Sequence, residues 1–127
     1  MACGAEGSVT GMVDIDAAVG FVVARGDALD RARLSRLRTG APPAADVYAD
    51  VERGQAGSGG WPAQWAGDVA SVDATCFRLA ELDNLDGLSR PAAVRALDWL
   101  VSQQGLSGWW EEDASLSDAA PPWAAWR

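Results

Sequence analysis

Apolar residues recur at three- and four-residue intervals along most of this chain, which is the pattern of helices that bury one face. A first helix is predicted over residues 13–25, with Asp14 and Asp16 in its first turn, where the helix dipole favours negative charge. Gly26 ends this helix, and a second is predicted over residues 27–40, with leucines opposite its arginines. The chain therefore opens with two short helices.

Three more helices are predicted after a proline pair that enforces a loop. Residues 44–53 form a short third helix, and Ser71 caps a fourth that ends at Gly87. The predicted buried stripe of this fourth helix includes Cys76, as a small apolar residue, and is widened by Phe77. Its other members are Val72, Leu79 and Leu82 or Asp83.

A fifth helix is predicted to open at Ser89, with Pro91 just inside, and to reach Gln103 or Gln104. Its apolar stripe follows the helical period at Val94, Leu97 and Val101. Beyond residue 113 no closing helix is recognisable.

A short loop motif occurs twice. Residues 55–61 read QAGSGGW and residues 104–110 read QGLSGWW, each a Gln-x-x-x-Gly-x-Trp, at a period of 49. Matching the Gly-Trp pairs instead gives a period of 48 and places Gln103 on Gln55. The residues that carry the repeat in either register are Gln55, Gly59, Gly60 and Trp61 in the first loop and Gln103, Gln104, Gly108, Trp109 and Trp110 in the second.

The residue types in these loops suit a joint between helical hairpins. A glutamine amide at a helix end can bond the unsatisfied backbone groups of a neighbouring helix terminus. Glycines allow a sharp turn with positive φ, and an indole covers a large apolar area at the junction. Regular structure is not expected over residues 55–71, which contain four glycines and a proline.

Composition supports an all-α chain, because alanine supplies 25 residues and isoleucine only one. All ten positive residues are arginine, against 18 acidic ones, for a net charge of −8, so nucleic acid is not an expected partner. High Ala, Arg and Asp without Lys indicates a high-GC, bacterial genome. The absence of histidine removes the commonest proton shuttle and metal ligand.

Cysteine content and the longest apolar run bear on the compartment. Cys3 and Cys76 form no disulfide framework, which favours a reducing compartment. The longest strongly apolar run, residues 17–24, is far shorter than the roughly 20 residues of a membrane span, and no positive residue precedes it as in a secretory signal. We therefore predict a cytoplasmic protein without a membrane span.

The two loops, with two helices between them, resemble the repeats of the squalene-type terpenoid cyclases and the protein prenyltransferase β subunits. Residues 59–82 are similar to one such repeat, and residues 103–113 begin the next. The resemblance implies helical hairpin repeats in an α/α toroid, in which inner and outer helices alternate around an apolar cavity. It predicts an N-terminal helical segment over residues 1–43, two repeats over 44–113, and a tail or the start of a truncated repeat over 114–127.

Size conflicts with a complete toroid, since the family's ring needs five or six hairpins and this chain supplies about two. The resemblance therefore implies an incomplete arc, either a piece of a longer protein or a small arc that pairs with another chain. Because incomplete repeat stacks expose an apolar face, we expect self-association or a completing chain.

Asp73 and Thr75 are the candidate catalytic residues that the resemblance supplies. In the cyclases an Asp at the start of an inner helix protonates an alkene or epoxide, within Asp-x-Asp-Asp-Thr or Asp-Cys-Thr. This chain reads S-V-D-A-T-C from Ser71, so Asp73 and Thr75 match while the flanking carboxylates are absent. The alternative is that Asp73 is a first-turn residue of a helix capped by Ser71, favoured by the dipole alone.

Other acidic groups are weaker candidates. Asp14 and Asp16 mimic Asp-x-Asp but read equally as solvated first-turn carboxylates. Residues 111–113 form an acidic loop that could hold Mg²⁺ bridging a diphosphate, yet three adjacent side chains do not by themselves build a site, and we predict no cofactor. Protein prenyl transfer is disfavoured, because its zinc site needs His, and Thr75 lies where its Cys would be.

The tryptophans suggest either cation stabilisation in a cavity or packing in the core and loops. They are Trp61, Trp65, Trp99, Trp109, Trp110, Trp123 and Trp126, and Trp99 could face a hairpin neighbour or a lumen. The sequence thus predicts part of an isoprenoid-processing protein that shapes an apolar cavity. The alternative is a non-catalytic helical-repeat module that binds a partner protein or an isoprenoid-like ligand.

Overall fold

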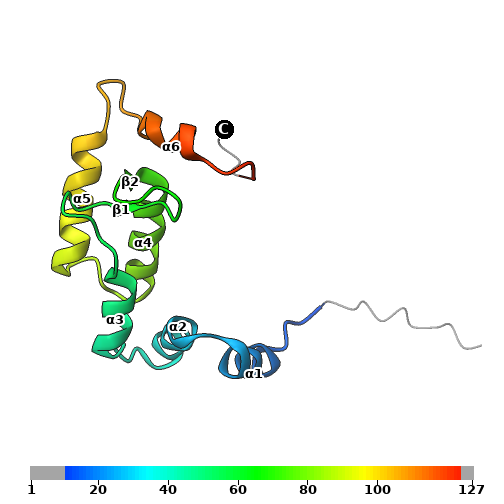
Figure 1. Cartoon of the computed structure of the whole chain (residues 1–127). Helices are drawn as coiled ribbons and strands as arrows, with labels where there is room; N and C mark the ends of the chain where they lie inside the picture. Colours follow the sequence, from blue (N-terminus) through cyan, green and yellow to red (C-terminus); the bar gives the residue numbers. More distant parts are fainter. Residues whose placement is uncertain (1–10, 124–127) are drawn as a thin grey trace, which may run out of the picture.

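Helices carry most of the regular structure in residues 11–123, the part of the chain that the computed structural model describes, and the all-α prediction is confirmed (Figure 1). The helices are α1 (Ile15–Arg25), α2 (Ala28–Thr39), α3 (Ala45–Glu52), α4 (Val72–Asn84), α5 (Pro91–Gln103) and α6 (Ala114–Ala119). Strands β1 (Trp61–Pro62) and β2 (Ala70–Ser71) form a small antiparallel ladder, with Trp61 opposite Ser71.

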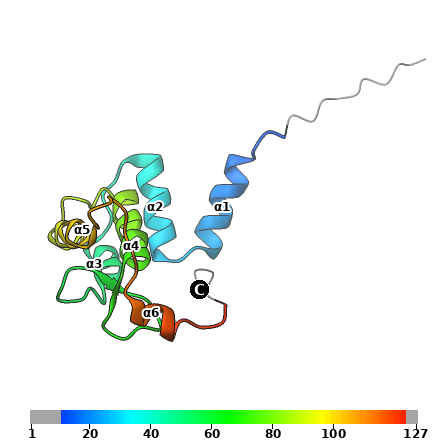
Figure 2. The same ribbon diagram turned by 90° about the horizontal axis from the view of Figure 1, so that it is seen from above.

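Consecutive helices lie against one another. Contacts join α1 to α2, α2 to α3, α3 to α4 and α4 to α5, so the chain is a run of neighbours in space as well as in sequence. Figure 2 shows α1 as an arm that stands away from α4 and α5, whereas α2 lies beside α4. Within residues 11–123, no helix has both the length and the apolar character that a bilayer crossing requires.

The core lies where α3, β1, α4 and α5 meet. Its buried members are Val47, Val51, Trp61, Leu79, Leu82, Leu85, Ala92, Ala93 and Ala96. In contrast, α1 contains no buried residue, and Phe21 on it is 67% exposed. A single small core therefore serves the middle of the chain, and apolar surface remains open at both ends.

The second helix begins close to its predicted start after Gly26, whereas α1 begins at Ile15 and not at residue 13 as predicted. Asp14 is the N-cap of α1 and accepts from the backbone N–H of Ala17 at 2.9 Å, and Asp27 forms a capping box with Asp30 at the start of α2. Their apolar stripes, however, are not buried among the described residues, and Leu37 on α2 is 82% exposed. Capping is local and was predictable, whereas burial needs a partner surface.

The predicted buried stripe of α4 is right at Leu79 and Leu82 and wrong at Cys76 and Phe77. Cys76 and Phe77 are exposed, while Thr75, Leu79 and Leu82 are buried. The cause is β1, which packs on α4 and contacts the face that carries Thr75. At this turn of α4 the buried residue is therefore Thr75 rather than Cys76, its neighbour roughly 100° around the helix.

The predicted stripe of α5 is also wrong, because its alanines form the buried face. Ala92, Ala93 and Ala96 are buried, whereas Val94, Leu97 and Val101 are 46%, 42% and 72% exposed. Small side chains let α5 approach its neighbours closely, and this outweighs the size of the aliphatic residues on the other face.

Three local predictions also need correction. A short β-ladder forms within residues 55–71, where no regular structure was expected. The N-cap of α5 is Arg90 rather than Ser89, with Pro91 at its first turn. Finally, α6 follows the second loop, where no closing helix was predicted, and Leu116 on it is buried.

Candidate functional site: the repeated loops and the head of α4

The first loop, residues 55–61, is closed by its own glutamine. Gln55 Nε2 donates to the carbonyl of Gly59 at 2.7 Å, and the backbone N–H of Ala56 donates to the carbonyl of Gly60 at 2.8 Å. Gly59 has φ of 107°, which a side chain would disfavour. The glutamine and glycine of the motif are thus used as predicted, to tighten a turn.

The second loop, residues 104–110, repeats this bonding at a period of 49. Gln104 Nε2 donates to the carbonyl of Gly108 at 2.5 Å, and the backbone N–H of Gly105 donates to the carbonyl of Trp109 at 2.9 Å. Gly108 also has positive φ, 89°. The register at a period of 48 is therefore excluded: Gln103 lies outside the motif and bonds Ser102.

The outer side of the first loop is covered by the start of α5. Gln55 Nε2 donates a second hydrogen bond to the carbonyl of Ala92 at 2.8 Å, and Arg95 donates to Gln55 Oε1 at 2.6 Å. Gly59 and Gly60 lie so close to α5 that a Cβ on either would meet Arg95 or Trp99. Trp99 thus faces a hairpin neighbour, which decides between its two predicted environments.

Trp61 anchors the first loop in the core. Its side chain is 2% exposed, and its backbone N–H donates to Thr75 Oγ1 at 2.8 Å. Thr75, a candidate catalytic residue, is itself fully buried, with 0% exposure. Its hydroxyl accordingly has a structural role here, since it holds the loop on α4.

The second loop lacks such a cover among the described residues. Trp109 and Trp110 are 65% and 44% exposed, and Trp110 Nε1 donates back to the carbonyl of Leu100 at 2.7 Å. Gln104 is exposed, and no α5-like helix lies against it within residues 11–123. The two loops share their internal geometry and differ in what covers them.

Glu112 joins the second loop to the head of α4, which is the N-cap and first turn of this helix. Its carboxylate accepts from the backbone N–H of Asp73 at 2.8 Å and of Val72 at 3.1 Å, and from Ser71 Oγ at 3.3 Å. Ser71 Oγ also accepts from the N–H of Ala74 at 3.1 Å, which confirms its predicted capping role. Sequence analysis missed this role of Glu112, because 39 residues separate it from Asp73.

Asp73 occupies the first turn of α4 and is exposed. With Cys76, Phe77 and Ala80 it lies on the face of α4 opposite the core, and all four are exposed. Desolvation of the Cys76 thiol and the negative charges of Asp73 and Glu112 raise its pKa. This face is therefore apolar along its length and negative at its head.

A hollow of about 430 Å³ lies at this head, lined by Asp73, Glu111, Glu112 and Ser117. Asp113, the last residue of the acidic loop, caps α6 and bonds Ser115, and these hydrogen bonds lower its pKa. No group of three possible ligands is placed to hold a metal ion within residues 11–123. The three acidic residues thus have separate positions and do not converge on one point.

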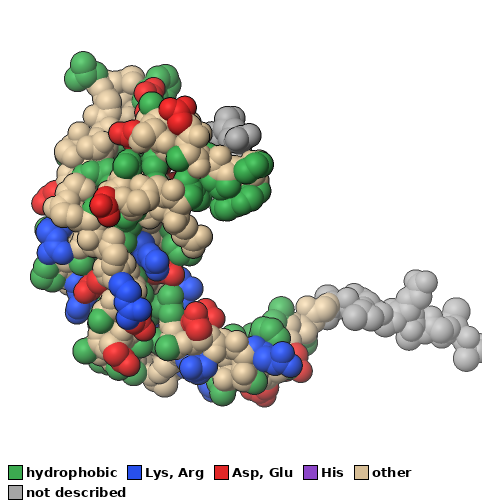
Figure 3. Space-filling view, viewed as in Figure 1, with side chains coloured by type: hydrophobic (Ala, Val, Ile, Leu, Met, Phe, Trp, Pro, Cys, Tyr) green, Lys and Arg blue, Asp and Glu red, His purple; other side chains and the backbone are tan. Residues whose placement is uncertain are grey.

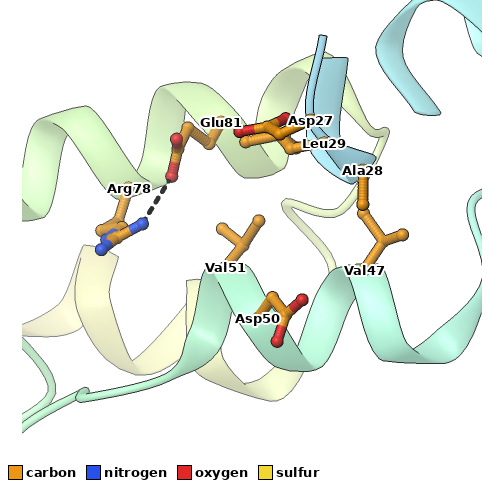
Figure 4. A pocket seen from close by; sticks show the side chains of 8 residues that line it. All are labelled: Asp27, Ala28, Leu29, Val47, Asp50, Val51, Arg78 and Glu81. Carbon is orange, nitrogen blue, oxygen red and sulfur yellow. Dashed lines mark hydrogen bonds and ion pairs between the residues drawn. The ribbon is translucent and has the colours of Figure 1, made fainter. Parts of the chain in front are cut away.

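A second hollow, of about 250 Å³, lies where α2, α3 and α4 meet (Figure 4). Its floor is apolar, with Leu29, Val47 and Val51. Glu81, 6% exposed, points into it and is paired with Arg78 at 3.0 Å, as the dashed line shows. The other two carboxylates that line the hollow are also engaged, since Asp27 caps α2 and Asp50 pairs with Arg53.

The remaining candidates lie away from the head of α4. Asp14 and Asp16 are at the start of α1, on the exposed arm. Trp65 stacks edge-on against Trp123, with ring centroids 5.6 Å apart, and Trp126 lies outside the described residues. Comparison with family models, with curated proteins and with solved structures returned no match to this chain.

Proposed function

We propose that this chain forms part of the wall of an apolar cavity that binds an isoprenoid chain, within a larger helical-repeat assembly. The observation that carries the proposal is the outward face of α4, where Phe77 is 63% exposed and Cys76 and Ala80 lie beside it. In Figure 1 this helix lies on the side of the stack that faces the open space between α6 and α1. Figure 3 shows the same side as a wide notch in the molecular surface.

The charge at the head of α4 argues for a neutral isoprenoid. Asp73, Glu111 and Glu112 line one hollow, and none of the nine arginines within residues 11–123 lines it. A diphosphate placed there would meet like charges, whose repulsion costs free energy. An uncharged alkene, alcohol or epoxide would meet only the apolar part of the face.

Binding is better supported than proton donation by Asp73. An aspartic acid that protonates an alkene must be held neutral by burial or by a neighbouring carboxylate. Asp73 is exposed, and the nearest acidic side chain, Glu112, is engaged by backbone N–H groups of α4. A catalytic role for Asp73 would therefore need further chain to cover this turn.

The proposal is tested by titrating the chain with a fluorescent farnesol. Phe77→Ser removes the largest apolar side chain of the α4 face, and we expect it to weaken binding roughly tenfold. Leu37→Ser is the matched control, since Leu37 is 82% exposed on a different helix. Farnesyl diphosphate is expected to compete more weakly than farnesol.

Three results would reject the proposal. They are no saturable binding of the probe, equal binding by the Phe77→Ser and wild-type chains, and equal loss of binding in Phe77→Ser and Leu37→Ser. In the last case the probe would be adsorbing to any exposed apolar residue.

A further inference from the structure

The internal joint between α3 and α5 shows what covers a loop of this kind. The first turn of α5 supplies the Ala92 carbonyl to Gln55, and Arg90 pairs with Glu52 at the end of α3 beside the same loop. Helix α5 begins Pro-Ala-Ala at residues 91–93. The cover is thus a helix start that presents a backbone carbonyl and little side-chain bulk.

The start of α3 has a similar sequence and is exposed, although Pro43 and Ala44 precede α3, which begins at Ala45, whereas Pro91 and Ala92 lie inside α5. It reads Pro-Ala-Ala at residues 43–45, and α3 leads into the first loop as α5 leads into the second. Ala44, the counterpart of Ala92, is exposed and is an N-cap without a side-chain hydrogen bond. Within residues 11–123, the second loop therefore has no helix start packed over it, and the start of α3 has no loop packed beneath it.

The residues beside these two surfaces are complementary. The counterpart of Glu52 at a period of 49 is Val101, which is 72% exposed, and the counterpart of Arg90 at a period of 48 is Pro42, which is also exposed. The ion pair of the internal joint is thus replaced by two apolar groups. Residues 104–123 carry four acidic side chains and no arginine, whereas α2, next to α3, carries four arginines and one Asp.

We infer that a second copy of this chain docks head to tail, with the start of its α3 covering the second loop of the first copy. Gln104 then bonds the carbonyl of Ala44 in the second copy, as Gln55 bonds Ala92 within one copy, and Val101 packs against Pro42. Because the two surfaces differ, the contact is heterologous: the first copy keeps a free α3 surface and the second copy a free second loop. The assembly grows with concentration and does not stop at a dimer.

Sedimentation of the full chain from about 1 µM to about 1 mM tests this directly. Val101→Glu blocks the second-loop surface and Pro42→Glu blocks the α3 surface, each by placing an unpaired charge in an apolar contact. We expect each variant alone to associate at least about tenfold more weakly than wild type. Val94→Glu is the matched control, two turns earlier on the same side of α5, and is expected to associate like wild type.

Mixing separates head-to-tail docking from other association. A mixture of the Val101→Glu and Pro42→Glu chains retains one intact pair of surfaces, so it should form a one-to-one complex and nothing larger. Far-UV circular dichroism checks that each variant is folded. A wild-type monomer across the whole range, equal loss in Val94→Glu and Val101→Glu, or no complex in the mixture would overturn the inference.

Discussion

The two loops have the same internal hydrogen bonds but different surroundings. The difference shows that the turn itself depends on residues within the loop, whereas its burial depends on the rest of the chain. Gln55 and Gln104 each close their own loop onto a glycine four residues later. Only Gln55 also bonds a following helix, and only Trp61 is buried, whereas its counterpart Trp110 is 44% exposed. A loop of this kind therefore forms without a following helix packed against it. When such a helix is present, as α5 is at the first loop, the loop becomes a packed junction between helices.

Truncating the tryptophans should give the largest difference between the loops. Trp61→Ala removes a fully buried indole from the core, so we expect a loss of about 3–5 kcal/mol in the free energy of unfolding. Trp110→Ala removes a half-exposed one and should cost about 1 kcal/mol. Urea unfolding of both variants at low protein concentration measures this, and comparable losses would show that the second loop is as well packed as the first.

Adding a methyl group at the two positive-φ glycines should give the next largest difference. A Cβ at Gly59 would lie 2.6 Å from the Arg95 carbonyl oxygen, whereas one at Gly108 would meet nothing closer than 4.0 Å. We expect Gly59→Ala to cost about 2–4 kcal/mol and Gly108→Ala about 1 kcal/mol, the latter from backbone strain alone. Thermal unfolding distinguishes the two, and a harmless Gly59→Ala would contradict the close approach of α5.

The glutamines should differ less. Gln55→Ala leaves the Ala92 carbonyl and Arg95 without their amide partner, for an expected loss of about 1–3 kcal/mol. Gln104→Ala loses one exposed bond to Gly108 and should cost about 0.5 kcal/mol. The same unfolding measurements apply, and a larger loss for Gln104 than for Gln55 in a dilute, monomeric sample would reverse the comparison.

The smallest predicted effect reports where the second loop lies. Desolvation, Asp73 and Glu112 hold the Cys76 pKa above its ordinary value, so less thiolate is present at a given pH and alkylation is slower. In a Cys3→Ser background, Glu112→Gln should lower this pKa and speed the reaction of Cys76 with iodoacetamide at pH 8 roughly twofold. Glu111→Gln is the control, and an identical rate in all three chains would place Glu112 away from α4.

Much of the fold was predictable because its signals are local. The start of α4 depends on the Ser71 oxygen, which lies a few residues from the group it bonds, and it was predicted. The buried face of α4 was predicted only in part, since Cys76 and Leu79 both fit one helical stripe but the packing of β1 leaves Cys76 exposed. Glu112 at the head of α4 was missed for the same reason, as no local pattern relates residues 39 apart.

The amino-acid sequence by itself determined that this protein is helical, that Ser71 caps α4, and that the chain bears two equivalent glycine- and tryptophan-containing loops. These properties follow from backbone preferences and from bonds between residues close along the chain. Tertiary structure alone decided the repeat register, which faces are buried, and that the first loop is covered while the second is open. Burial depends on which surfaces pack against one another, and this packing involves residues that are far apart along the chain.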